Sequence, residues 1–243
     1  MIAGTRARLT QATRPDDKIM NDYLPAIELQ NTEHPDFAVI WLHGLGADGG
    51  DFAGIPPELG LPESAAVRFI FPHAPMIPVT CNAGYVMRAW YDILSIDGID
   101  RVTDEAGIRA SVAAIRRLIA RENERGVPTA RIVLAGFSQG GAMAYTAGLT
   151  HPEALAGIIA LSAYMPAQSL VDKERSPANR TTPIFAAHGS QDEVVPPQLG
   201  LAARDALRAD GYAIEWHSYP MPHSVCIEEI QAVGAWLAAR LAG

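Results

Sequence analysis

The stretch Gly136-Phe137-Ser138-Gln139-Gly140 decides how this 243-residue chain is interpreted, because it fits the pattern G-x-S-x-G. An apolar, β-branched run (131–135) precedes it and a run of small residues (142–147) follows it, which predicts a strand, a sharp turn and a helix. In such a turn the serine hydroxyl projects away from the backbone, and glycines prevent crowding. The five residues alone fit an ordinary glycine-lined turn equally well, so the rest of the chain must decide.

Length and composition favour one large α/β core. The chain is 49% hydrophobic, carries a net charge of −8 and has a pI near 5.3. We predict a single domain over 23–243, preceded by an extension over 1–22. The acidic balance disfavours a nucleic-acid partner, which needs a concentrated basic face, and it disfavours adhesion to anionic membranes.

The compartment predicted from the sequence is the cytoplasm. No run approaches the roughly 20 apolar residues that span a bilayer, so no stable membrane insertion is expected. Residues 1–22 are polar and lack the apolar middle region of a secretory signal. Cys81 and Cys226 form neither a disulfide scaffold nor a cysteine-rich zinc site, which fits a reducing compartment and a protein without a bound metal.

Apolar runs typical of buried strands alternate with segments of helical period. The predicted strands cover 38–42, 67–71, 132–135, 157–161, 184–187 and 213–219. A helix is predicted over 103–125 and another from about Ser224 to the end, whereas 73–101 and 169–182 have no clear period. This alternation predicts an α/β fold: a mostly parallel central sheet with helices on both faces and no large lid domain.

Two later residues complete a set that can activate a serine. A serine hydroxyl needs a base to take its proton and a third group to orient that base. Asp192 and His223 each follow a predicted strand, in the chain order serine, acid, histidine. Each alone would more often be a turn or structural residue. Because all three fall at carboxyl ends of strands, we assign Ser138 as nucleophile, His223 as base and then acid, and Asp192 as its orienting group.

Other residues compete for these roles. Glu193 is the rival acid, and His188 is interpreted as a structural neighbour of the acid loop. Four other histidines do not lie in a loop that follows both the acid and a strand: His43, His73, His151 and His217. Asp192 is preferred over Glu193 because of its spacing from His188-Gly189.

Acyl transfer also needs donors for an oxyanion. One is the backbone N–H of Gln139, the residue after the nucleophile. The glycine-rich loop 43–49 follows an early strand, and we predict the Leu45 N–H as the second donor. This loop fits neither a P-loop nor a dinucleotide fingerprint.

Six stretches together resemble the phospholipase/carboxylesterase family of α/β-hydrolases, which includes bacterial carboxylesterases and acyl-protein thioesterases. They are 42–49, 71–75, 89–92, 136–141, 188–196 and 223–225. The resemblance covers about Tyr23 to the C-terminus. It implies the triad Ser138, Asp192 and His223, an oxyanion hole from the N–H groups of Leu45 and Gln139, and a small enzyme without a large lid domain, of a kind often found as a homodimer. The esterase reaction that follows from this triad needs no cofactor.

Four apolar residues in or after loops are candidates for binding a substrate: Met87, Trp90, Tyr91 and Met165. Packing in the core is an equally good interpretation for each. The leading hypothesis is a serine carboxylesterase that hydrolyses short- to medium-chain esters, with a small-molecule ester or thioester as substrate. An acyl-protein thioesterase or lysophospholipase is the alternative within hydrolases, and a non-catalytic binding module on an esterase fold is the alternative from another class.

Overall fold

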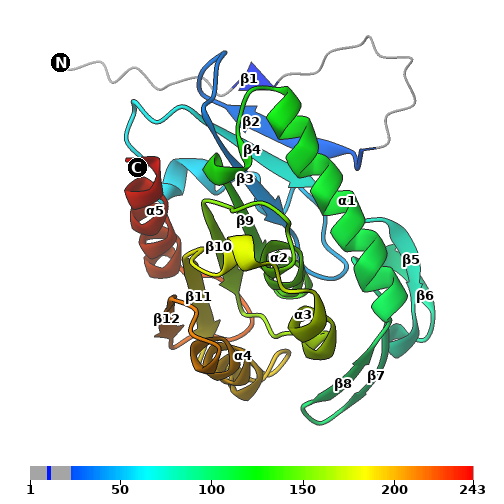
Figure 1. The fold of residues 1–243 in the computed structure, drawn as a ribbon. Helices are drawn as coiled ribbons and strands as arrows, with labels where there is room; N and C mark the ends of the chain where they lie inside the picture. Colours follow the sequence, from blue (N-terminus) through cyan, green and yellow to red (C-terminus); the bar gives the residue numbers. More distant parts are fainter. Residues whose placement is uncertain (1–9, 12–22, 243) are drawn as a thin grey trace, which may run out of the picture.

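An eight-stranded sheet forms the centre of the computed structural model, which describes residues 10–11 and 23–242 (Figure 1). Its strands, in spatial order, are β1 (Thr10–Gln11), β2 (Ala26–Gln30), β4 (Val67–Pro72), β3 (Phe37–Leu42), β9 (Ile132–Phe137), β10 (Gly157–Leu161), β11 (Ile184–Gly189) and β12 (Ile214–Tyr219). From β4 to β12 all neighbours are parallel, and β1 and β2 add an antiparallel edge. The predicted mostly parallel sheet is confirmed.

Helices cover both faces of this sheet, as predicted. They are α1 (Glu105–Glu124), α2 (Gln139–Leu149), α3 (Gln168–Glu174), α4 (Pro197–Ala209) and α5 (Ile227–Leu241). Side chains of α1 to α4 pack on one face, whereas α5 and the short 3-10 helix η1 (Pro56–Leu59) pack on the other. Of the predicted extension, only Thr10–Gln11 is described, as the edge strand β1; residues 1–9 and 12–22 lie outside the described part of the chain.

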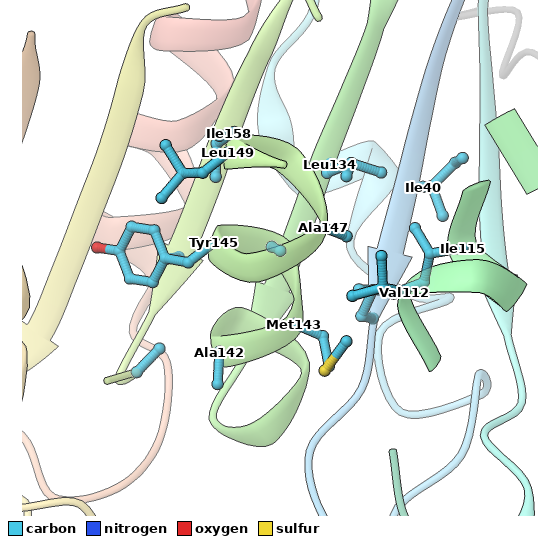
Figure 2. Close-up of a cluster of buried hydrophobic side chains, with 14 of the residues drawn as sticks. Ile40, Val112, Ile115, Leu134, Ala142, Met143, Tyr145, Ala147, Leu149 and Ile158 are labelled. Carbon is cyan, nitrogen blue, oxygen red and sulfur yellow. The ribbon is translucent and has the colours of Figure 1, made fainter. Parts of the chain in front are cut away.

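Alternation along the buried strands divides the core in two. In β3, Ile40 faces the cluster beneath α1 and α2, and the next residue, Trp41, faces the cluster beneath α5. Figure 2 shows the first cluster, in which Val112 and Ile115 of α1 lie on one side of α2 and Tyr145 lies on the other side. The α2 helix is therefore buried along its whole length.

The segment 73–101 differs from the prediction because it contains most of two small hairpins. They are formed by β5 (Met76–Val79) with β6 (Tyr85–Arg88), and by β7 (Ile93–Asp97) with β8 (Asp100–Thr103). Both turns use residues with positive φ, at Ala83-Gly84 and at Gly98. Several apolar side chains on these strands are exposed, so the alternation of apolar and polar residues that marks a strand is hard to recognise in the sequence. The segment 169–182 likewise contains most of α3, which buries Leu170 and Val171.

One carboxylate in the first turn of α5 is buried without compensation. Glu229 has no exposed surface, and among the described residues neither of its oxygens has a hydrogen-bond partner. Burial raises the pKa of Glu229 to about 8. The neighbouring Glu228 is exposed to solvent.

Glu229→Gln should flatten the dependence of stability on pH. An unfolded Glu ionises near pH 4.5, whereas the folded group keeps its proton up to about pH 8. Between these values the folded state binds the extra proton, so the free energy of unfolding of the wild type falls as pH rises, by on the order of 1 kcal/mol per pH unit. Urea denaturation across this range measures the slope. Glu228→Gln should retain it, and an unchanged slope in Glu229→Gln would contradict the assignment.

Candidate active site

Ser138 sits between β9 and α2 in a backbone conformation that few residues adopt. Its φ is 55° and its ψ is −121°. Tight contacts enforce this geometry: a Cβ on Gly136 would lie 2.3 Å from the carbonyl carbon of Gly140, and one on Gly140 would lie 2.1 Å from the Leu42 oxygen. Both glycines of the G-x-S-x-G pattern are therefore required by close approach of the backbone, and the serine is held at the point of the turn.

Three loops at the carboxyl edge of the sheet bring Ser138, His223 and Asp192 together. They follow β9, β12 and β11, respectively. His223 Nε2 lies 2.9 Å from Ser138 Oγ, and His223 Nδ1 lies 2.6 Å from Asp192 Oδ2. The three side chains thus form a continuous hydrogen-bonded chain from a hydroxyl to a carboxylate.

Asp192 is buried but well supplied with donors. Its Oδ1 accepts the N–H groups of Val194 (2.9 Å) and Val195 (2.8 Å), and its Oδ2 lies 3.4 Å from His188 Nε2. Burial by itself would raise the pKa of Asp192, but hydrogen bonds from His188, His223 and the Val195 N–H outweigh it and hold the pKa well below its usual range. An ionised Asp192 accepts a hydrogen bond from the N–H at His223 Nδ1, which leaves His223 Nε2 free to accept one from Ser138.

The competing residues occupy other places. Glu193 is exposed, and its carboxylate makes no hydrogen bond or ion pair within the part of the chain that the structure describes. His188 is buried, and its Nε2 lies 2.8 Å from the Val195 oxygen, so its ring supports the loop that carries Asp192. This arrangement agrees with the interpretation of His188 as a structural neighbour of the acid.

The two predicted oxyanion donors belong to segments that adjoin Ser138. Gln139 is the first residue of α2, where an N–H has no acceptor within the helix. Leu45 lies in the loop after β3, and no acceptor among the described residues takes its N–H. A Cβ on Gly44 would lie 3.4 Å from Ser138 Cβ, so this loop passes beside the serine. The α2 N-terminus adds a positive dipole end at the same place.

The four predicted substrate-binding residues lie in three different places in the structure. Met87 lines an open groove of about 470 Å³ beside the 43–49 loop. The sequence interpretation did not identify the other apolar side chains of this groove, Met76, Tyr85 and Val86, because they lie on the unpredicted hairpin. Met165 instead lines a small crevice between α3 and α4.

Trp90 and Tyr91 are core residues rather than groove residues. Trp90 is 2% exposed and Tyr91 has no exposed surface, because both pack in the cluster beneath α1 and α2. The indole N–H of Trp90 donates to the His43 oxygen at 2.9 Å, and the Tyr91 hydroxyl lies 2.9 Å from that of Tyr164. Their polar atoms are thus engaged inside the protein.

Within the described residues, no group of three or more His, Cys, Asp or Glu side chains is arranged to hold a metal ion. The helices of the same residues include none that is long and apolar enough to cross a bilayer.

Comparison with known proteins gives a consistent result. Residues 25–241 match the family described as Phospholipase/Carboxylesterase. Acyl-protein thioesterase 1 of Neurospora crassa is 46% identical over 84% of this chain and 86% of its own. The solved structure of Arabidopsis thaliana SOBER1 superposes with a TM-score of 0.80 at 31% identity, over 84% of this chain and 99% of that one.

A second solved structure, Zea mays acyl-protein thioesterase 2, superposes with a TM-score of 0.78 at 28% identity, over 90% of this chain and all of that one. The family match spans nearly the whole described chain and includes the Ser138 turn and the loops of Asp192 and His223. The chain therefore belongs to the phospholipase/carboxylesterase family of α/β-hydrolases and is a hydrolase of the serine type.

Proposed function

We propose that this chain is a serine carboxylesterase in which Ser138, His223 and Asp192 form the catalytic triad. The observation that carries the proposal is the continuous chain of contacts, 2.9 Å from Ser138 Oγ to His223 Nε2 and 2.6 Å from His223 Nδ1 to Asp192 Oδ2. In this arrangement the base is correctly oriented before a substrate arrives.

The reaction proceeds through an acyl-enzyme. Ser138 Oγ forms a bond to the ester carbonyl carbon while His223 Nε2 takes the hydroxyl proton, and the carbonyl oxygen becomes an oxyanion. The N–H groups of Leu45 and Gln139 stabilise this charge. When the intermediate collapses, the bond to the leaving group breaks and His223 returns the proton to that group. Water then repeats the sequence, releases the acid and restores Ser138, with no metal or organic cofactor.

The groove beside the 43–49 loop is the proposed substrate site. Its volume of about 470 Å³ is in the range of small-molecule sites. Its lining combines apolar residues with charged residues of both signs: Met76, Val86, Met87, Asp48, Asp51 and Arg88. This mixed, open groove favours short- to medium-chain esters presented in water. The names of the relatives favour a second candidate, an acyl-protein thioesterase, in which the same triad cleaves a thioester.

We also propose that residues 23–243 act as one domain in the cytoplasm and, because the family resemblance implies it, that the enzyme is a homodimer. The continuous core on both faces of one sheet supports the single domain. The acidic net charge of −8 supports an enzyme that remains dissolved rather than one that adheres to anionic surfaces.

Ser138→Ala should abolish turnover while leaving the fold intact. The substitution removes the nucleophile, and the loss of a triad member typically costs several orders of magnitude in kcat. Hydrolysis of p-nitrophenyl butyrate measures the loss, and circular dichroism verifies folding. Wild-type turnover by a folded Ser138→Ala protein would refute the assignment. Failure of the wild type to react with a fluorophosphonate would instead favour a non-catalytic binding module.

Asp192→Asn and Glu193→Gln form a matched pair that separates the two candidate acids. Asparagine is neutral and its amide can present an N–H to His223 Nδ1, which favours the wrong tautomer of the base, so we expect kcat to fall by roughly 10³–10⁴-fold. Glu193→Gln, one residue away and exposed, should leave kcat essentially unchanged. The reverse pattern would transfer the role of the acid to Glu193.

A series of acyl chains from about two to about sixteen carbons, supplied as paired oxyesters and thioesters, tests the substrate class. A mixed, open groove should give a maximum of kcat/KM at short to medium oxyesters. A maximum at long thioesters would select the acyl-protein thioesterase instead. Ser138→Ala, measured in parallel, corrects for spontaneous hydrolysis.

A further inference from the structure

Trp90 makes two polar contacts that packing alone does not require. Its backbone N–H donates to Gln139 Oε1 at 2.8 Å, and its indole N–H donates to the His43 oxygen at 2.9 Å. All three residues are buried. One contact therefore reaches the residue that supplies the first oxyanion donor, and the other reaches the loop that supplies the second.

Both polar atoms of the Gln139 carboxamide make a hydrogen bond in this arrangement. While its Oε1 accepts from the Trp90 N–H, its Nε2 donates to the Tyr91 oxygen at 2.9 Å. The amide is thus hydrogen-bonded to the backbone of the 90–91 segment both as a donor and as an acceptor. Because Gln139 is also the first residue of α2, these two bonds connect the segment to the start of that helix.

The His43 ring continues the network into the second donor's loop. Its Nε2 accepts the Ala74 N–H at 3.0 Å, so the ring proton must be on Nδ1, which lies 2.7 Å from the Gly44 oxygen and donates to it. Burial lowers the pKa of His43, although the bond to Gly44 acts in the opposite direction, and the ring is therefore kept neutral in this tautomer.

These contacts fix the direction of the Leu45 N–H. A peptide unit is planar and, among the described residues, always trans, so a carbonyl and the following N–H point in opposite directions. Holding the His43 oxygen fixes the 43–44 unit, and holding the Gly44 oxygen fixes the 44–45 unit. The N–H of that second unit belongs to Leu45.

We propose that Trp90 is a positioning residue of the oxyanion hole: it joins the Gln139 side chain to the His43–Leu45 loop and so sets the separation and angle of the two donors. The proposal rests on the esterase function proposed above. The buried indole then affects the transition state without touching the substrate. It acts through the position of the two N–H donors, which lose much of their stabilising effect on the oxyanion when they are misplaced.

Trp90→Phe and Trp41→Phe provide the matched test. Trp41 is as buried as Trp90, but among the described residues its indole N–H has no partner, so Trp41→Phe removes indole packing without removing a hydrogen bond. The variants are compared by thermal unfolding, by kcat and KM on p-nitrophenyl butyrate, and by the affinity of a trifluoromethyl ketone. That ketone bonds reversibly to Ser138 Oγ and its carbonyl oxygen becomes an oxyanion, so its affinity reports on the hole.

We expect Trp90→Phe to lose more thermal stability than Trp41→Phe, because it also leaves the buried His43 oxygen without the indole donor. Only Trp90→Phe should lower kcat, by about tenfold to a hundredfold, with KM little changed and the ketone affinity falling in parallel. Equal kcat in the two variants, or a change confined to KM, would overturn the proposal. Labelling by a fluorophosphonate distinguishes a failure of the esterase function from a failure of the positioning role. An unlabelled wild type would overturn the esterase function itself. A labelled wild type together with a fully active Trp90→Phe variant would overturn only the positioning role.

A second pair covers the outcome that Trp90→Phe does not fold. In His43→Asn the side-chain amide can reach the place of Nδ1 and donate to the Gly44 oxygen, whereas in His43→Gln it reaches the place of Nε2 toward Ala74. Positioning predicts that His43→Asn keeps more kcat and more ketone affinity than His43→Gln at matched stability. Equal losses in the two variants would show that the network contributes only to folding.

Discussion

The close approach of α2 to the strands beside it is the constraint on which the site depends. At Gly136 and Gly140 the backbones of β9, α2 and the end of β3 meet without room for a side chain. This contact forces Ser138 into its positive φ and places its hydroxyl outside the turn. It also packs the start of α2 against the backbone of Leu42 and His43, so that one packing contact brings together the nucleophile and the two segments that carry the proposed oxyanion donors.

The parallel sheet positions the other two residues of the proposed triad, Asp192 and His223. Because β11 and β12 run in the same direction as β9, their following loops reach the same edge and deliver Asp192 and His223 to the serine. The loops are themselves restrained by short contacts: the Ser190 N–H donates to the Tyr219 oxygen at 2.8 Å, and the Gln191 N–H donates to the Met221 oxygen at 3.1 Å. The acid and base loops are thus bonded to each other, which keeps the two side chains in register.

Sequence patterns predicted the sheet and the Ser138 turn well because both rest on local signals. Buried strands such as β3 are continuous apolar runs, and the glycines of the turn have a steric cause that the letters reveal. The β5–β6 hairpin was not predicted because its strands are short, only one of their residues is buried, and they pair only with each other. The sequence offered Trp90 only as a substrate-binding or a core-packing residue. No local pattern indicates that the indole N–H of a buried loop tryptophan donates to the oxygen of residue 43.

Two buried carboxylates show what distinguishes a group suited to catalysis from one that is merely enclosed. Asp192 and Glu229 have almost no exposed surface, yet their pKa values move in opposite directions. Burial opposes ionisation in both. Asp192 overcomes it because two backbone N–H groups and two imidazoles surround its oxygens, whereas no donor among the described residues faces those of Glu229. Asp192 lies in the loop after β11, and Glu229 lies in the first turn of the helix after β12. What separates them is the arrangement of donors that the fold builds around one carboxylate, which allows Asp192 to remain an anion and to hold the proton of His223 in place.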